Sequence, residues 1–238
     1  MIMHAEESKE QYIERLFASI APRYDLLNSV LSLNLHKEWR KYAVNQCNLW
    51  PGDKALDVCA GTLDFAIELS RAVGASGSVT AVDFCRPMLE VGEKKLLKKG
   101  INNVSPIEGN AECLPLPSES FQAATIGFAL RNVSSVEKTV SEMARAVCKG
   151  GRVVCLELAL PQRGLFRSVY GLYLNRILPF IGGAVNGKRE PYQYLPASVA
   201  SFCSREELAG IMEKVGLAEI AIYDLTGGAA TVHVGTKK

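Results

Sequence analysis

The chain has 238 residues, of which 48% are hydrophobic and 22% are charged, and its formal net charge at pH 7 is +2. This length suits one sizeable α/β domain and is short for two, so we treat residues 1–238 as a single domain. So small a net charge gives no indication of nucleic-acid binding. The seven cysteines include no C-x-x-C pair, and the charged N-terminus lacks an apolar run of signal-peptide length. We therefore expect a reduced, cytoplasmic protein without a metal site.

A helical segment precedes the first expected strand. Residues 7–19 have an amphipathic pattern that predicts a helix, and Pro22 ends it. Residues 23–44 predict two short helices with a hinge near Asn34. Because this segment comes before the sheet, we expect residues 1–50 to form a helical cap over its carboxyl edge, where an acceptor substrate would be enclosed.

The stretch from Ala55 to Asp64 predicts a buried strand, a tight turn at Gly61 and a helix that starts just after it. The next strand, Ser78 to Val82, closes on Asp83. A carboxylate at the tip of the second strand can accept hydrogen bonds from a ribose diol, which predicts an adenosine-containing ligand. The alternative for Asp83 is a strand-end or helix-cap carboxylate.

Asp64 helps to distinguish between the possible adenosine-containing cofactors. A dinucleotide site places a pyrophosphate at the helix N-terminus within a G-x-G-x-x-G turn. Here only Gly61 is present, and it is followed by an acidic side chain that would repel phosphate. S-adenosylmethionine carries no phosphate, and its ammonium and sulfonium groups are cations. The sequence therefore favours S-adenosylmethionine over a nicotinamide dinucleotide.

Polar residues also follow the third and fourth expected strands. Asn110 and Ala111 come after the third strand, where an amide can bond the edge of adenine; a plain Asx turn is the alternative. Arg131 and Asn132 come after the fourth strand. This pair is a functional candidate facing the crevice, and the alternative is a surface arginine that caps a neighbouring helix.

The rest of the pattern alternates helices and strands. Helices are expected at 87–99, at 136–147, where Gly150-Gly151 would end the helix, in an insertion at about 162–200, and at 204–216 after a Ser204-x-x-Glu207 capping box. The further strands are Val104–Ile107, Phe121–Phe128, Arg152–Leu158 and a hairpin of Leu217–Tyr223 and Ala230–Val234. With residues 51–238 as its core, this is a doubly wound, mostly parallel seven-stranded α/β sheet with an antiparallel last strand, the Rossmann-like plan of a class I methyltransferase.

Several stretches carry a family resemblance. Tyr24-Asp25-Leu26-Leu27-Asn28, with Ser32, His36 and Trp39, resembles the first signature of the UbiE/MenG family, the C-methyltransferases of ubiquinone and menaquinone biosynthesis, and departs only at Leu27. Arg145 to Ala159 resembles the second signature, with departures at Cys148, Lys149 and Ala159. Residues 127–133 (GFALRNV), 192–202 and 225–235 are similar to further blocks of that family.

The resemblance implies S-adenosylmethionine-dependent C-methylation of a prenylated quinol ring, foremost demethylmenaquinol. By position, it implies that the cofactor is bound by Gly61, Thr62, Asp83, Asn110 and Ala111, with Gly127 near it. It implies that the quinol ring is surrounded by Tyr24, Asp64, Arg131 and Asn132. The alternatives are a related methyltransferase acting on another phenolic or small acceptor, and a weakly active or inactive scaffold subunit.

A ring carbon is a weak nucleophile until the neighbouring phenol, whose pKa is near 10 as in tyrosine, loses its proton. We expect the permanently charged Arg131 to stabilise the phenolate, with Asp64 and Asn132 orienting the arginine and a bridging water. Tyr24 would bond the ring oxygen. No single general base is assigned; His36 titrates near neutrality, but on a predicted helix we interpret it as structural.

Leu63 departs from the family turn, which reads G-T-G-D and is Gly61-Thr62-Leu63-Asp64 here. If this position needs a positive φ, leucine costs on the order of 1–3 kcal/mol and would affect cofactor binding.

The segment Leu165 to Ile181 interleaves aromatic and aliphatic residues with arginines, and polar residues and Pro179 interrupt it too often for a membrane span. Three interpretations are open: an interfacial helix that admits a prenyl tail at the inner face of the cytoplasmic membrane, core packing, or a homodimer contact.

Overall fold

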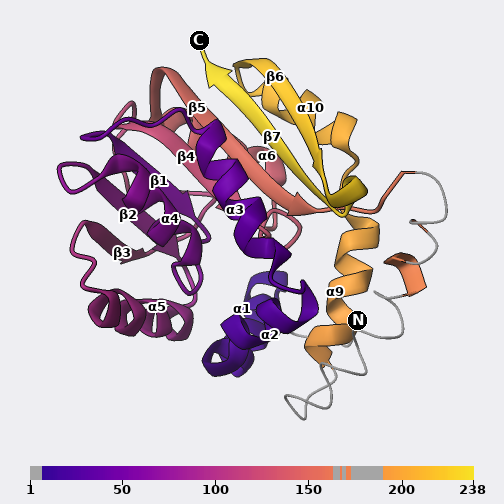
Figure 1. Ribbon diagram of the computed structural model, residues 1–238. Coiled ribbons are helices and arrows are strands. Elements are labelled where there is room, and N and C mark those ends of the chain that lie inside the picture. The colour runs from indigo at the N-terminus through magenta and orange to yellow at the C-terminus, as the bar shows by residue number, and fades with distance from the viewer. Residues whose placement is uncertain (1–6, 163–166, 168–169, 173–189) are drawn as a thin grey trace.

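A seven-stranded sheet in the order β3-β2-β1-β4-β5-β7-β6 forms the centre of the computed structural model, which describes residues 7–162, 167, 170–172 and 190–238 (Figure 1). The strands are β1 (Lys54–Val58), β2 (Ser78–Asp83), β3 (Val104–Glu108), β4 (Phe121–Gly127), β5 (Val147–Leu158), β6 (Leu217–Leu225) and β7 (Ala230–Lys237). Pairing is parallel from β3 to β5, whereas β7 runs antiparallel to β5 and β6. The predicted doubly wound α/β sheet with an antiparallel last strand is confirmed.

Helices cover both faces of the sheet. One face carries α3 (Leu35–Gln46), α4 (Asp64–Val73) and α5 (Arg86–Lys99), and the other carries α6 (Val136–Ala146) and α10 (Arg205–Lys214). Strand β1 contributes Ala55 to one hydrophobic core and Leu56 to the other, and both are fully buried. Strands that are apolar on both sides are typical of a parallel sheet between helical layers.

The N-terminal segment is helical, as predicted. It forms α1 (Lys9–Ile20), a 3-10 turn (Ala21–Arg23), α2 (Tyr24–Leu31) and α3, and the hinge residue Asn34 is left-handed with φ 64°. α1 and α2 lie beyond the carboxyl ends of the strands, with α1 against α9 (Glu190–Ser201), whereas α3 packs against α4 and β5 (Figure 1). Of the helices expected in the cap, α1 and α2 lie at the edge and α3 belongs to a face of the sheet.

One predicted boundary was wrong. Helix α6 ends at Ala146, within one residue of the predicted end at 147, but β5 begins at Val147, which pairs with Phe121, and not at Arg152. A Cβ on Gly151 would lie 2.6 Å from the backbone oxygen of Gln122. This glycine therefore permits close contact between strands and does not end a helix.

Most of the segment Leu165 to Ile181 lies outside the described residues, so its three interpretations stay open. Among the residues that the structure does describe, no helix combines the length and the apolar character needed to cross a membrane.

Candidate functional site

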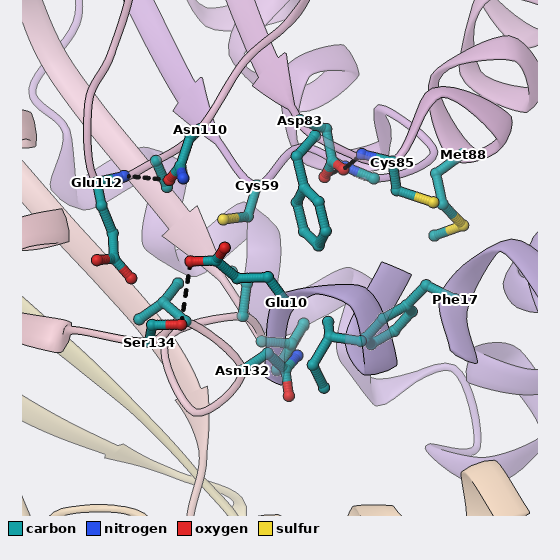
Figure 2. Close-up of a pocket in the computed structure, with 18 of the residues that line it drawn as sticks. Glu10, Phe17, Cys59, Asp83, Cys85, Met88, Asn110, Glu112, Asn132 and Ser134 are labelled. Atoms are coloured by element: carbon teal, nitrogen blue, oxygen red, sulfur yellow. Dashed lines mark hydrogen bonds between the residues drawn. The ribbon is translucent and has the colours of Figure 1, made fainter. Parts of the chain in front are cut away.

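A cleft opens at the carboxyl edge of the sheet, between the ends of four strands on one side and the cap on the other (Figure 2). Its space, including the part open to solvent, is about 790 Å³. The cap contributes Glu10, Ile13, Phe17 and Tyr24. The strand ends and the segments after them contribute Cys59, Gly61, Asp83, Phe84, Cys85, Met88, Asn110, Ala111, Glu112, Gly127, Phe128, Ala129, Asn132, Val133 and Ser134. This is the place where open α/β sheets bind their ligands.

Asp83 connects the end of β2 to the glycine turn after β1. Its Oδ2 accepts a hydrogen bond from the backbone N–H of Gly61 at 2.7 Å, and its Oδ1 accepts one from Cys85 at 2.8 Å. Burial raises the pKa of Asp83 to about 6, and the backbone N–H groups oppose this shift. Each oxygen retains a lone pair. The carboxylate can therefore hold the turn, which agrees with the alternative interpretation of Asp83 as a strand-end or helix-cap residue, and it can also accept hydrogen bonds from a diol.

Asn110 and Ala111 line the cleft after β3. The Asn110 side-chain oxygen accepts a hydrogen bond from the backbone N–H of Glu112 at 2.8 Å, so the Asx turn that was the alternative interpretation is present. The turn orients a side chain that also faces the cleft. Gly127 ends β4, and a Cβ there would lie 2.6 Å from the Phe65 ring, so packing against α4 requires glycine at this position.

Thr62 and Asp64 belong to an ionic network rather than to the cleft lining. Thr62 donates a hydrogen bond to Asp25 Oδ1 at 2.6 Å, and the Lys95 ammonium contacts Asp25 at 2.6 Å and Asp64 at 2.5 Å. Arg40 contacts the other oxygen of Asp64 at 3.2 Å. Burial acts to raise the pKa of Asp64, but the charges of Arg40 and Lys95 hold it below its ordinary value. The network joins α2, α3, α4 and α5 around the glycine turn.

Arg131 lies outside the cleft lining, and only 7% of its side chain is exposed. Its Nη1 donates hydrogen bonds to the Glu157 carboxylate and to the backbone oxygen of Phe128, while its Nε has no hydrogen-bond partner among the described residues. The interpretation of Arg131 as a surface helix cap is therefore wrong. The buried Glu157 holds the guanidinium away from the residues that line the cleft, and the expected contact of Arg131 with a substrate ring stays a prediction.

Asn132 and Tyr24 do line the cleft. Asn132 Oδ1 accepts a hydrogen bond from the Tyr194 hydroxyl at 3.0 Å, and the Tyr194 ring meets Tyr12 of α1 edge-on, with ring centroids 5.9 Å apart. Tyr24 meets Phe17 in the same manner at 5.9 Å. Tyr24 is thus in direct contact with α1, and Asn132 is connected to α1 through Tyr194.

His36 is buried on α3, and its Nδ1 lies 2.5 Å from the Ser32 hydroxyl. Burial lowers its pKa to about 4, so the imidazole is neutral at physiological pH. It is not among the residues that line the cleft. These contacts favour the structural interpretation of His36.

α1 supplies lining residues that the sequence analysis did not single out, Glu10 above all. The amphipathic pattern of residues 7–19 predicts that Ile13 and Phe17 face inward, but a period of 3.6 does not distinguish a core face from a ligand face. The expected position of the cap over the carboxyl edge was the one signal that could have identified them.

Leu63 has a left-handed φ of 64° and is fully buried. The condition for strain at this position is therefore met. Its side chain occupies the space next to Gly92 of α5, where an added Cβ would lie 2.3 Å from Leu63 Cγ. Leu63 belongs to the hydrophobic core and does not line the cleft.

The chain is similar to known methyltransferases in sequence. The model of the ubiE/COQ5 methyltransferase family matches residues 5–237. A demethylmenaquinone methyltransferase of Alkalihalophilus pseudofirmus is 41% identical over 231 residues, which cover 97% of this chain and 98% of that protein. The demethylmenaquinone methyltransferase of Bacillus subtilis is 40% identical over 232 residues, covering 98% of this chain and 100% of that protein.

Solved structures share the fold. A SAM-dependent methyltransferase from Thermotoga maritima superposes with a TM-score of 0.67 at 22% identity, covering 95% of this chain and 100% of that one. A SAM-dependent methyltransferase from Aquifex aeolicus gives a TM-score of 0.62 at 18% identity, covering 84% of this chain and 89% of that one.

Proposed function

Because the chain belongs to the ubiE/COQ5 methyltransferase family, we propose that it methylates a ring carbon of demethylmenaquinol with S-adenosylmethionine, giving menaquinol and S-adenosylhomocysteine. The chain is an S-adenosylmethionine-dependent methyltransferase, and the nearly full-length similarity to demethylmenaquinone methyltransferases is the observation that carries the choice of acceptor. The reaction belongs to menaquinone biosynthesis.

The cleft suits this cofactor. The charged side chains among its described lining residues are all acidic, and S-adenosylmethionine carries a net positive charge. When bound, S-adenosylmethionine supplies an electrophilic methyl group on a cationic sulfur. We assign Asp83 to the ribose diol, Asn110 and Ala111 to adenine, and Gly61 and Gly127 to the strand-end turns that admit the cofactor.

We assign the acceptor to the cap side of the cleft, where Tyr24 and Asn132 present the polar groups and Phe17 and Phe128 present the apolar ones. The Tyr24 hydroxyl and the Asn132 amide would bond ring oxygens and favour the phenolate, which raises electron density on the ring carbon. In this arrangement Arg131 is a positioning residue, because it bonds the backbone of Phe128 and does not line the cleft. Asp64 and Thr62 are positioning residues as well, because they hold the glycine turn at Gly61 and do not line the cleft.

We include contact with a lipid surface in the proposal. Four large apolar side chains of α2, the adjoining turn and the first residue of α3 are exposed: Leu26, Val30, Leu33 and Leu35, with Leu33 79% exposed. An exposed apolar group beside the wall of a cleft is suited to a substrate that carries a prenyl tail and resides in a bilayer.

The proposed activity is tested with methyl-labelled S-adenosylmethionine and demethylmenaquinol presented in phospholipid vesicles. We expect label to enter the quinol ring with formation of S-adenosylhomocysteine, and slower transfer to the demethylated ubiquinol precursor. Transfer to neither acceptor by a protein that binds S-adenosylmethionine would move the assignment to a methyltransferase with another small acceptor.

Asp83 gives a pH-dependent prediction. The ionised Asp83 accepts hydrogen bonds from a diol more strongly than the protonated acid does. With a pKa of about 6, the affinity for S-adenosylmethionine should be constant above about pH 7 and about fivefold to tenfold weaker at pH 5. Calorimetric titration across this range measures the effect.

Asp83→Asn is the matched control. The amide should bind S-adenosylmethionine about tenfold more weakly at pH 7.5, because charge-assisted hydrogen bonds are lost, and its affinity should vary much less with pH. Acid unfolding cannot explain weaker binding at low pH. The pKa of Asp83 is raised in the folded state, which therefore binds the proton more tightly than the unfolded chain does. The stability that this group contributes falls as pH rises through about 4 to 6, which is opposite to the expected change in affinity. A pH profile that Asp83→Asn leaves unchanged would contradict the assignment.

A further inference from the structure

Glu10 differs from the other two charged residues among the described lining of the cleft, Asp83 and Glu112. Backbone N–H groups hold both of those carboxylates: Gly61 and Cys85 donate to Asp83, and Ser135 donates to Glu112 at 2.7 Å. Glu10 comes from α1 in the cap and accepts a hydrogen bond from the Ser134 hydroxyl at 3.2 Å. Figure 2 shows its carboxylate reaching across the cleft toward Ser134, with Asp83 and Glu112 nearer the sheet.

Neighbouring contacts fix the face of α1 that carries Glu10. Lys9 Nζ donates a hydrogen bond to the backbone oxygen of Val133 at 2.5 Å, next to Ser134, and does not itself line the cleft. Ile13 is buried, one turn along from Lys9 and Glu10. These contacts orient α1 so that Glu10 adds a negative charge to the cleft, in which the other charged side chains of the described lining are also negative.

We propose that Glu10 is a specificity-determining residue that favours S-adenosylmethionine over the reaction product through its charge, an inference that rests on the proposed function. S-adenosylmethionine has one ammonium, one sulfonium and one carboxylate, so its net charge is +1. When the methyl group leaves with its bonding electrons retained by sulfur, the sulfonium becomes a neutral thioether and S-adenosylhomocysteine has no net charge. An acidic cleft attracts the first molecule more strongly than the second.

The size of the effect follows from distance and exposure. Glu10 is solvent-exposed at the cleft, so its interaction with a cation several ångströms away is weakened by water and changes affinity by about threefold to fivefold. The effect should shrink with salt, because exposed charges are screened. A role limited to docking α1 through Ser134 would change the binding of both molecules equally.

The test is calorimetric titration of the full chain with S-adenosylmethionine and, separately, with S-adenosylhomocysteine, at about 20 mM and about 500 mM salt. Glu10→Gln keeps a hydrogen-bond acceptor for Ser134 and removes the charge. We expect it to weaken S-adenosylmethionine about threefold to fivefold at low salt and S-adenosylhomocysteine by less than about 1.5-fold. Glu14→Gln, at an exposed position of α1 that does not line the cleft, is the control and should change neither affinity.

Ser134→Ala separates charge from docking, since it removes the hydrogen bond to Glu10 and keeps the carboxylate. The ratio of the two affinities should stay as in the unaltered protein. Equal weakening of both molecules by Glu10→Gln, or an unchanged affinity for S-adenosylmethionine, would overturn the inference while leaving the methyltransferase intact. If the unaltered protein binds neither molecule, the proposed function itself fails.

Discussion

Replacing Arg131 with alanine is expected to lower the free energy of unfolding by about 3–5 kcal/mol, because it leaves the buried Glu157 carboxylate without its cationic partner. Turnover should fall as well, since the hydrogen bond from Arg131 to the Phe128 backbone holds a loop that lines the cleft. Affinity for S-adenosylmethionine should change much less than turnover. Urea unfolding followed by circular dichroism, together with kcat and calorimetry below the unfolding transition, measures the three quantities.

The double variant Arg131→Met with Glu157→Gln is the control, because it removes both buried charges together. It should recover most of the lost stability, since the large penalty belongs to the unpaired charge and not to the absence of the pair. Turnover should remain low, because methionine cannot donate to the Phe128 oxygen. An alanine variant as stable as the unaltered protein would contradict the buried pair, and equal loss of cofactor affinity and turnover would contradict the positioning role.

Replacing Gly92 with alanine is expected to destabilise the protein by about 2 kcal/mol, although alanine favours a helix by about 1 kcal/mol over glycine. The added Cβ would lie 2.3, 2.7 and 3.0 Å from the Cγ, Cδ1 and Cβ atoms of Leu63. Overpacking of this kind costs about 1–3 kcal/mol, and the upper end applies because the closest atom is a branch carbon and not the end of a flexible chain. Thermal and urea unfolding give the value.

Leu63→Ala provides the second arm of a double-mutant cycle. Alone it should cost about 2–5 kcal/mol, because it removes a fully buried leucine side chain. In that background Gly92→Ala should no longer be destabilising, since the two closest contacts vanish with the leucine side chain. Equal destabilisation by Gly92→Ala in both backgrounds would show that the strain does not come from Leu63.

The sequence predicted the elements that local pattern determines. The hinge at Asn34 and the strand, turn and helix from Ala55 to Asp64 lie where the pattern indicated them, because each depends on neighbouring residues. The start of β5 was misjudged at Arg152 because the pair Gly150-Gly151 was interpreted as a helix stop. A glycine pair also permits close strand pairing, and the contact that decides between these two roles comes from Gln122 on β4.

In the candidate site, too, local spacing predicted the positions of some residues but not of others. Gly61 and Asp83 meet at one edge of the sheet, as the spacing of strand ends along the chain predicts, and their contact with the cofactor stays a prediction. Arg131 and Asp64 were expected in the cleft but pair with Glu157 and Lys95, partners that single-sequence spacing does not reveal. Leu63 has the left-handed φ that the sequence analysis linked to a cost for cofactor binding, but its side chain packs in the core and does not line the cleft.

The pairing of Asp25 with Thr62 has a thermodynamic consequence. Tyr24 lines the cleft where we propose that the acceptor binds, and the next residue, Asp25, accepts a hydrogen bond from Thr62 in the turn that we assign to the cofactor. One peptide unit and this hydrogen bond connect the two proposed halves of the site, so we expect a ligand that orders the turn to order the tyrosine as well. Such linkage is reciprocal: whatever factor the first ligand adds to the affinity for the second, the second must add to the affinity for the first.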